Sequence, residues 1–281
     1  MNPLSRVEKF QPQKGGAISR RVSARKGESS SRGTVIQEVT FSSVKEDAVN
    51  FGLATDVLHQ MSAGKEASIF LAQWKEHPII LKVYRLYQSS HQLSKKKGYV
   101  TQASSKRTYC ILNMMEDLAV AEYDILMSCF QMGVHSPTPI GRVANMLTMR
   151  FIGDGIDPAP QLRDVTLQNP EQVLDQILDD YLIMYRDAHY VHGDLSRYNI
   201  LWWQERPWII DVPQAYKVGV HSDMNKAEAI LKRDISNVLG YFEEYGIYRD
   251  EEHILDVFLS AYIPKNLKHY RELRREGGEL L

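Results

Sequence analysis

The stretch that decides the fold lies between residues 190 and 214 and reads YVHGDLSRYNILWW at 190–203 and PWIIDVPQ at 207–214. Each part contains a short run of apolar residues that favour a β-strand. A compact polar loop precedes the first run, and Asp211 follows the second. The two runs therefore predict strands that bring Asp194, Asn199 and Asp211 to one place.

The order and spacing of these three residues are typical of phosphoryl transfer. In a kinase catalytic loop, an Asp accepts the proton of the attacking hydroxyl, and an Asn five residues on holds a metal ion. A second Asp, after an apolar strand, is the principal Mg²⁺ ligand. Such a set is needed because the enzyme must position the reacting groups and neutralise the negative charge that is distributed over the transferred phosphoryl group. A single Asp in a loop is more often a turn residue, so the interpretation depends on all three.

With these residues the chain resembles the RIO family of atypical protein kinases. The shared motifs are HGDLSRYN at 192–199 and IIDVPQ at 209–214, and the resemblance covers roughly residues 55–245. It implies an α+β, two-lobed protein-kinase-like fold with a small β-rich N-lobe and a reduced helical C-lobe. It also implies ATP with Mg²⁺ or Mn²⁺ as cofactors, a protein substrate, and a link to maturation of the small ribosomal subunit. By the same resemblance, Ser196 would tune the catalytic loop and contact the nucleotide.

Composition sets wider limits. The chain has 281 residues, of which 43% are apolar, and its formal net charge is −1. The length and apolar content are enough for one large domain or two lobes. The near-zero net charge gives no electrostatic field over the whole molecule that would attract nucleic acid. No run approaches the roughly 20 apolar residues of a membrane span, and the N-terminus has no apolar signal core. Cys110 and Cys129 are isolated and match no metal spacing. We expect a cytoplasmic protein without a membrane segment.

Residues 1–33 are expected to form a disordered basic arm. They contain eight Lys or Arg against two Glu, with few large apolar groups. Such a segment cannot bury enough surface to offset its ordering entropy. The arm could contact nucleic acid or an acidic partner, or it could be a solvated tail. The resemblance to RIO kinases implies that the arm and the basic loop at 85–112 would contact ribosomal RNA of a pre-ribosomal small subunit.

From Asp56 the pattern indicates strands, with a hairpin-like turn between Asp56–Met61 and Ala67–Ala72. The turn is Ser62-Ala63-Gly64-Lys65-Glu66, and a glycine there lets the backbone approach a ligand. A surface turn is the default interpretation, because a single Gly is a weak phosphate-binding signal. The turn resembles the Ser-Thr-Gly-Lys-Glu-Ala of RIO kinases, which implies that Ser62, Gly64, Lys65 and Glu66 bind the nucleotide.

Lys82 stands inside the strongly β run IILKVY at 79–84. A Lys flanked by apolar residues on a half-buried strand needs an anionic partner or a route to water. Glu122 falls on the apolar stripe of a helix expected over Asn113–Met132. The two side chains would form one ion pair, as the strand-3 Lys and helix-C Glu of kinases do, or they would both reach solvent. The loop motif favours the pair, with Lys82 as phosphate ligand.

The segment before that helix is expected to be a flexible loop over residues 85–112. Arg85 to Arg107 contains six Lys or Arg, no acidic residue and several Ser. RIO kinases insert a flexible loop here, which implies self-phosphorylation at a serine in it. The candidates are Ser89, Ser90, Ser104 and Ser105. A serine in a polar loop is otherwise simply solvated.

Strands expected at Thr138–Val143 and Met146–Ile152 are followed by a Gly- and Pro-rich segment, residues 153–160. Such a density of Gly and Pro is typical of a hinge. We therefore place the N-lobe at 34–152 and the C-lobe at 153–262. The segment resembles the RIO hinge, which implies that the backbone at Arg150 and Ile152 contacts the adenine edge. Met149 would lie behind the adenine, and Pro160 would also line the nucleotide.

The C-lobe is predicted to be helical. A helix capped by Asn169 and opened by Pro170 would support the catalytic loop, with Glu171, Asp175 and Asp179 on its solvated side. A second amphipathic helix over 225–244 carries Arg233-Asp234, which either supports the catalytic loop, as family likeness implies, or is an exposed ion pair. A last helix over 251–262 and a charged tail at 263–281 follow. Trp202, Trp203 and Trp208 are expected in the core.

Two other functions are consistent with the same residues. One is a small-molecule phosphotransferase of the aminoglycoside or choline kinase type, because His192-Gly193-Asp194 also resembles that group. The other is an ATP-switched module that docks on a pre-ribosomal particle, with Asp211 as a conceivable phosphate acceptor. The Ser-x-Gly-Lys-Glu-Ala turn and the Val-x-Gln after Asp211 favour the RIO interpretation over the first alternative.

Overall fold

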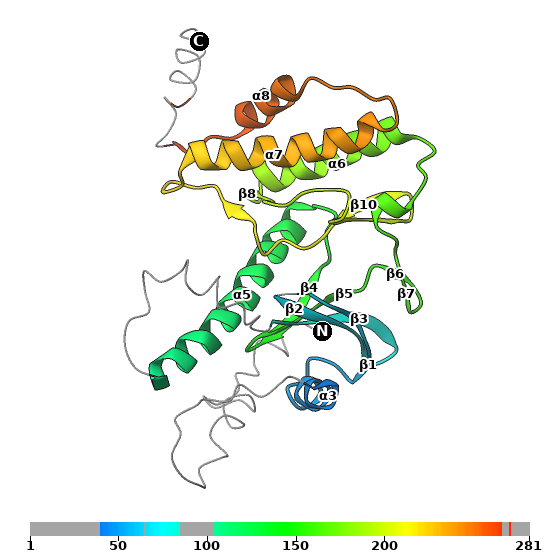
Figure 1. Cartoon of the computed structure of the whole chain (residues 1–281), viewed down its shortest axis with the longest axis vertical. Helices are drawn as coiled ribbons and strands as arrows, with labels where there is room; N and C mark the ends of the chain where they lie inside the picture. Colours follow the sequence, from blue (N-terminus) through cyan, green and yellow to red (C-terminus); the bar gives the residue numbers. More distant parts are fainter. Residues whose placement is uncertain (1–39, 65, 85–103, 266–269, 271–281) are drawn as a thin grey trace. The chain divides into compact units, whose positions relative to one another are not determined.

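The computed structural model describes residues 40–64, 66–84, 104–265 and 270, although the side chains of residues 104–113 lie outside that description (Figure 1). The chain divides into two compact units. The first includes the described residues up to 124 together with 138–151, and the second includes 125–137 and the described residues from 152 onward. Residues 125–137, which the sequence placed in the N-lobe, belong to the second unit.

The first unit is built on an antiparallel sheet with strands in the order β1-β2-β3-β5-β4. The strands are β1 (Asp56–Ala63), β2 (Ala67–Trp74), β3 (His77–Tyr84), β4 (Pro139–Val143) and β5 (Met146–Arg150). All five were expected from their β-favouring runs. A preceding helix, α3 (Phe41–Asn50), was not expected from the sequence; Thr40 caps it by accepting a hydrogen bond from the Ser43 N–H.

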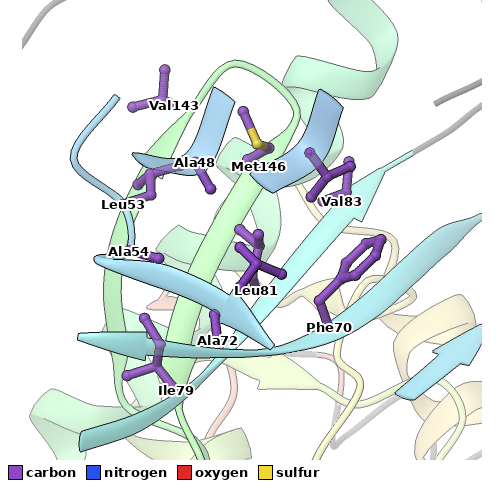
Figure 2. Close-up of a cluster of buried hydrophobic side chains, with 12 residues drawn as sticks. Ala48, Leu53, Ala54, Phe70, Ala72, Ile79, Leu81, Val83, Val143 and Met146 are labelled. Carbon is purple, nitrogen blue, oxygen red and sulfur yellow. The ribbon is translucent and has the colours of Figure 1, made fainter. Parts of the chain in front are cut away.

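One face of this sheet carries the apolar core of the first unit. Side chains from α3, from alternate positions of β3 and from the β4–β5 hairpin gather there (Figure 2). On β3 these positions are Ile79, Leu81 and Val83. Because side chains alternate across a strand, Lys82 and Tyr84 lie on the other face. There Tyr84 packs with Met115 and Ala119 of the long helix α5 (Ser104–Met132).

The start of α5 corrects one expectation. Residues 104–112 were assigned to the flexible loop, but the helix begins at Ser104 rather than near Asn113. The physical reason is that Lys106, Arg107 and Leu112 have good helix propensity, and a helix nucleated by its packed C-terminal part extends into the preceding segment. Ser104 and Ser105 are therefore helical in their backbone, whereas Ser89 and Ser90 lie outside the described residues.

The second unit is mainly helical. Its principal helices are α6 (Pro170–Arg186), α7 (Met224–Glu243) and α8 (Glu251–Ala261), with the short helix η1 (Leu162–Asp164). Their buried faces follow the predicted apolar stripes, and Glu171, Asp175 and Asp179 of α6 are exposed as predicted. Asn169 precedes α6 as expected, but its side chain makes no capping hydrogen bond. Its backbone, at φ −124° and ψ 71°, lies outside the usual β conformation of a cap, which accounts for the difference.

Short strand pairs frame the loop motif. Strand β9 (Ile200–Trp203) pairs with β10 (Arg206–Ile209), and β8 (Tyr190–Val191) pairs with β11 (Tyr216–Lys217). The hinge segment forms β6 (Gly153–Asp154) and β7 (Asp157–Pro158). The three tryptophans of the β9–β10 hairpin are only half-buried, because this two-stranded hairpin is too small to cover them fully; Trp203 also donates a hydrogen bond from Nε1 to Asp154.

Several predicted features lie outside the described residues: the basic arm at 1–33, Lys65, the part of the loop at 85–103, and the tail at 266–269 and 271–281. Within the described part of the chain, no helix combines the length and apolarity that a bilayer span requires.

Candidate active site

The predicted ion pair between Lys82 and Glu122 is present in the first unit. Lys82 Nζ lies 2.8 Å from Glu122 Oε1, and the two residues are only 6% and 1% exposed. The pair forms because Lys82 occupies the α5-facing side of β3, and Glu122 follows Met115 and Ala119 on one face of α5. The tyrosine at position 84, which sequence reasoning left aside, donates a hydrogen bond from its hydroxyl to Glu122 Oε2. Its position two residues after Lys82 was the available signal.

The turn between β1 and β2 has the expected hairpin form. Gly64 N–H donates to the Ala67 carbonyl at 2.9 Å, and a Cβ at Gly64 would lie 3.3 Å from that oxygen. Ser62, Gly64 and Glu66 are exposed to solvent. Their predicted contact with nucleotide phosphates stays a prediction.

The backbone groups of the predicted adenine segment are partly engaged. Arg150 N–H donates to the Thr138 carbonyl at 2.8 Å within the first unit, and Ile152 carbonyl accepts from Ala159 N–H at 3.0 Å within the second. The predicted contact of this backbone with the adenine edge stays a prediction. Met149 is buried, as a residue behind the base would be, and the exposed Pro160 accepts a hydrogen bond from Trp202 N–H.

In the second unit, the loop between β8 and β9 holds Asp194 and Asn199. Asn199 Nδ2 donates to the backbone carbonyl of Asp194 at 2.8 Å and to its carboxylate Oδ2 at 3.1 Å. The amide thus orients the Asp194 carboxylate, whose side chain is exposed. Asn199 N–H also donates to the Ser196 carbonyl at 2.9 Å, so Ser196 shapes the turn between them.

Asp211 follows β10, as predicted. Its carboxylate is exposed, and its backbone has a φ of +62°, which is uncommon outside glycine. Ile210 N–H donates to the Asn199 carbonyl at 2.9 Å, which ties the position before Asp211 to Asn199. With its amide nitrogen turned toward Asp194, Asn199 offers Oδ1 to a cation. An amide oxygen and a carboxylate fit Mg²⁺, which takes few protein ligands when substrate phosphates complete its coordination.

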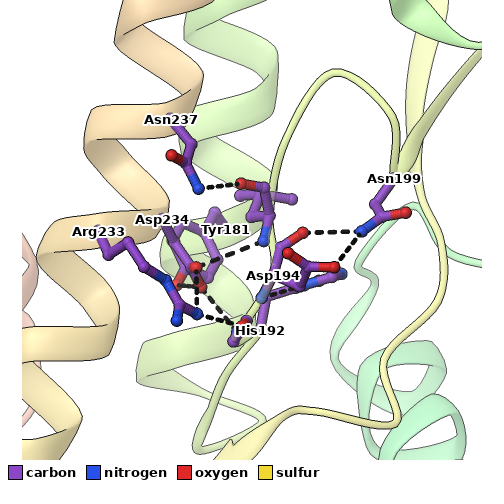
Figure 3. Close-up of polar contacts among 9 residues, drawn as sticks. Tyr181, His192, Asp194, Asn199, Arg233, Asp234 and Asn237 are labelled. Carbon is purple, nitrogen blue, oxygen red and sulfur yellow. Dashed lines mark hydrogen bonds and ion pairs between the residues drawn. The ribbon is translucent and has the colours of Figure 1, made fainter.

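Asp234 of α7 holds the loop from behind (Figure 3). It is fully buried and accepts hydrogen bonds from Gly193 N–H at 2.7 Å, Leu195 N–H at 3.4 Å and Tyr181 Oη at 2.8 Å. Burial, together with the charge of Asp234, raises the pKa of the Tyr181 phenol well above its usual range, so this hydroxyl stays a donor. Arg233 donates to the Gly193 carbonyl. The predicted supporting role of Arg233-Asp234 is confirmed over the exposed-pair alternative.

His192 is the buried ring beneath the loop. Asp194 N–H donates to His192 Nδ1 at 3.2 Å, so Nδ1 must carry a lone pair. The proton therefore sits on Nε2, which donates to the Ile210 carbonyl at 3.0 Å. Burial lowers the pKa of His192, against the opposing effects of the Ile210 carbonyl and nearby carboxylates. A neutral imidazole thus connects the loop of Asp194 to the residue before Asp211.

A second polar chain, not foreseen from the sequence, holds the β9–β10 hairpin. Arg206 Nη1 lies 2.8 Å from His135 Nε2, and His135 Nδ1 lies 2.8 Å from Asp180 Oδ1. Because a guanidinium only donates, Nε2 accepts and Nδ1 carries the proton toward Asp180. Burial raises the pKa of the Asp180 carboxyl, although His135 and Arg206 oppose this shift. His135 carbonyl also accepts from Ile209 N–H at 2.8 Å, which fixes the strand that leads to Asp211.

Comparisons with known proteins identify the family of the chain. The family model of the RIO domain matches residues 68–254. The RIO-type serine/threonine-protein kinase Rio1 of Thermoplasma acidophilum is 40% identical over 133 residues, which are 47% of this chain and 67% of that protein. The serine/threonine-protein kinase RIO1 of Caenorhabditis elegans is 28% identical over 253 residues, which are 77% of this chain and 49% of that protein. The chain thus matches only about half the length of that relative.

Solved structures show the same fold. A crystal structure of the Rio2 kinase from Chaetomium thermophilum has a TM-score of 0.64 at 17% identity, covering 95% of this chain and 88% of that one. Its complex described as ADP/Mg²⁺-phosphoaspartate has a TM-score of 0.60 at 18% identity, covering 100% and 96%. The predicted α+β, protein-kinase-like fold with a β-rich and a helical part is confirmed.

Proposed function

The chain belongs to the RIO family, and from this premise we propose that it is an ATP-dependent serine/threonine protein kinase. The observation that carries the proposal is the arrangement of Asp194, Asn199 and Asp211. The amide of Asn199 orients the Asp194 carboxylate, and a backbone hydrogen bond links Asn199 to the residue before Asp211. These two links support the assignment of Asp194 as proton acceptor and of Asn199 and Asp211 as metal ligands.

Each residue has a defined task in this proposal. Asp194 accepts the proton of the acceptor hydroxyl through the carboxylate that Asn199 orients. Asn199 Oδ1 and the Asp211 carboxylate hold Mg²⁺, which supplies charge neutralisation at the transferred phosphoryl group. Lys82, held by Glu122, binds ATP phosphates. The backbone at Arg150 and Ile152 contacts adenine, and residues 62–66 contribute phosphate contacts.

A second outcome of the same site is ATP hydrolysis through a phosphorylated aspartate. Two observations favour it: the Asp211 carboxylate is exposed, and the Rio2 kinase of similar fold is described as a phosphoaspartate complex. In this reaction the Asp211 carboxylate attacks the γ-phosphorus and releases ADP, and water then cleaves the acyl phosphate. Such an enzyme would act as a switch instead of modifying a protein.

The partners follow from the family and from charge. We propose a cytoplasmic protein that takes part in small ribosomal subunit maturation and contacts RNA through residues 1–33, where basic residues outnumber acidic ones by eight to two. Such contact would weaken steeply with salt, because phosphate binding releases counterions.

The first experiment measures ATP turnover with Mg²⁺ for the wild type, Asp194→Ala and Asp211→Ala, following both phosphate release and label on protein. Each variant should lose activity by about 100-fold or more, which corresponds to about 3 kcal/mol for a lost catalytic group. Asp179→Ala, an exposed acidic residue of α6, is the control and should match the wild type. If Asp194→Ala and Asp211→Ala also match it, the proposed function is wrong.

The nature of the label separates kinase from ATPase. Phosphoserine survives hydroxylamine, whereas an acyl phosphate on Asp211 is cleaved by it. Hydroxylamine-stable label on serine supports the kinase, and labile label that disappears in Asp211→Ala, together with steady phosphate release, supports the ATPase. Turnover that rises only with an aminoglycoside or choline as acceptor would instead indicate the small-molecule phosphotransferase.

A further inference from the structure

The buried carboxylate of Glu122 has two different donors. Lys82 Nζ lies 2.8 Å from Oε1, and the Tyr84 hydroxyl donates to Oε2. Glu122 is 1% exposed, so both of its oxygens must be satisfied within the protein. A carboxylate held only by Lys82 would leave its second oxygen without a donor, at a substantial cost in a buried site.

The second donor also determines geometry. The terminal torsion of a glutamate is broad, so one contact at Oε1 does not set the plane of the carboxylate. A second contact, from a hydroxyl to Oε2, sets this plane, because both oxygens of the carboxylate are then constrained. The position of Oε1, and with it the position of the Lys82 ammonium, therefore depends on Tyr84.

Tyr84 is itself held rigidly. Its N–H donates to the Asn145 carbonyl at 2.9 Å, and Asn145 Nδ2 donates to the Tyr84 carbonyl at 2.6 Å. The residue is fully buried, and its side chain packs with Met115 and Ala119 of α5. A donor fixed at both its backbone and its ring is preorganised for the carboxylate it binds.

The ring makes a further contact with the same lysine. Lys82 Nζ lies 5.4 Å from the centroid of the Tyr84 ring, within the range of a cation–π interaction. The ammonium is thus placed by the ring directly and by the hydroxyl through Glu122. Tyr84→Phe separates the two contributions, since it keeps the ring and removes only the hydroxyl.

We propose that Tyr84 is a positioning residue for the phosphate-binding lysine, acting through the Glu122 carboxylate. The inference rests on the proposed function, because it assigns Lys82 to ATP phosphates. It names a third member of the Lys82–Glu122 site and a reason for a tyrosine at this position of β3. A residue that only stabilised the fold would affect the unfolding free energy and leave the kinetics of the folded protein unchanged.

The test compares Tyr84→Phe with the wild type at a temperature where both are folded. We expect kcat/KM for ATP to fall about 10-fold, below the roughly 100-fold that a 1 Å misplacement can cause. Binding of a non-hydrolysable ATP analogue, measured by titration calorimetry, should weaken together with it. Tyr185→Phe is the matched control. The hydroxyl of this buried tyrosine donates to the Tyr262 carbonyl at 2.9 Å, and removal of that hydroxyl should leave kcat/KM unchanged.

A double-mutant cycle identifies the route of the effect. In a Glu122→Ala background the hydroxyl of Tyr84 has lost its acceptor, so Tyr84→Phe should change kcat/KM less than about 2-fold. Full additivity of the two changes would overturn the proposal. So would a Tyr84→Phe variant with wild-type kinetics and analogue affinity, provided that Lys82→Ala is inactive. If Lys82→Ala itself matches the wild type, the proposed function fails instead.

Should Tyr84→Phe fail to fold, Asn145→Ala takes its place. This variant keeps the hydroxyl but removes the side-chain hydrogen bond to the Tyr84 carbonyl. A fall in kcat/KM that disappears in the Glu122→Ala background supports the proposal. An unchanged kcat/KM overturns it.

Discussion

Gly193 lies so close to Gln214 that a Cβ at residue 193 would come within 2.4 Å of the Gln214 carbonyl oxygen and 3.0 Å of its carbonyl carbon. Gly193 also has a φ of +85°, a conformation that other residues rarely adopt. Gly193 immediately precedes Asp194, and Gln214 follows Asp211 by three residues. The segments that carry the proposed base and the proposed metal ligand therefore pack backbone against backbone, and only glycine fits there.

Gly193→Ala should consequently damage both stability and turnover. The left-handed backbone costs about 1–2 kcal/mol for an alanine, and the clash with Gln214 adds to it. Gly133→Ala is the control, because Gly133 has a φ of +83° and a Cβ there would meet no other atom within 4 Å. Urea unfolding should show the larger loss for Gly193→Ala, with reduced ATP turnover only in that variant. Equal losses and intact turnover in both would contradict the packing argument.

Asp234→Asn tests the support behind the loop. An asparagine of the same shape places an NH₂ group where one of the oxygens now accepts from Gly193, Leu195 or Tyr181. At least one donor then faces another donor, which should cost about 2–3 kcal/mol of unfolding free energy. Turnover should also fall, because the loop is no longer held. Asp179→Asn, exposed on α6, should change stability by less than about 0.5 kcal/mol, and a similar value for Asp234→Asn would refute the role.

The buried His192 should make stability depend on pH. Its pKa is lowered in the folded protein, so between that value and about 6.5 the unfolded chain binds more protons than the folded one. The unfolding free energy should therefore rise with pH in this window. The contribution of His192 to stability is fully present above about pH 6.5 and is lost as the pH falls through the window. The largest slope for one group is about 1.4 kcal/mol per pH unit.

Urea unfolding between about pH 5.5 and 7.5 measures this slope. This range lies above the usual pKa values of Asp and Glu side chains, so most carboxyl groups do not titrate in it. Asp180, whose pKa is raised, contributes with the opposite sign, because its folded form binds more protons above pH 3.8. His192→Asn should flatten the slope near pH 6, whereas His253→Gln, at an exposed position of α8, should keep it. An unchanged slope in His192→Asn would assign the pH dependence elsewhere.

Helix caps provide a contrast between sequence and structure. Asp250 accepts hydrogen bonds from Glu252 N–H at 3.0 Å and His253 N–H at 3.1 Å, whereas Asn169 makes no such bond. Asp250→Ala should therefore destabilise the protein by about 1 kcal/mol, and Asn169→Ala by only a few tenths. Thermal or urea unfolding of the two variants decides the matter; an equal loss would mean that the side chain of Asn169 does cap α6 in solution.

Short-range patterns in the amino-acid sequence predict most of the secondary structure and the three residues of the loop motif. Strands β1 to β5 and helices α6, α7 and α8 follow from short-range periodicity, which records which face of an element is buried. Asp194, Asn199 and Asp211 lie within one short stretch, so their spacing carries the chemistry directly. The exceptions were local as well: α3 and the first turns of α5 have weak patterns that packing overrides.

The side chains that hold these residues in place come from the packing of separate elements. Tyr84 meets Glu122, Asp180 meets His135, and Gly193 meets Asp234 across 38 to 45 residues of chain. No periodicity within a strand or helix specifies such partners, because they depend on how separate elements pack. Local sequence patterns thus identify the groups that could perform the chemistry. Only the packed fold orients these groups, because the hydrogen-bond donor of a buried carboxylate comes from an element that is distant in the sequence.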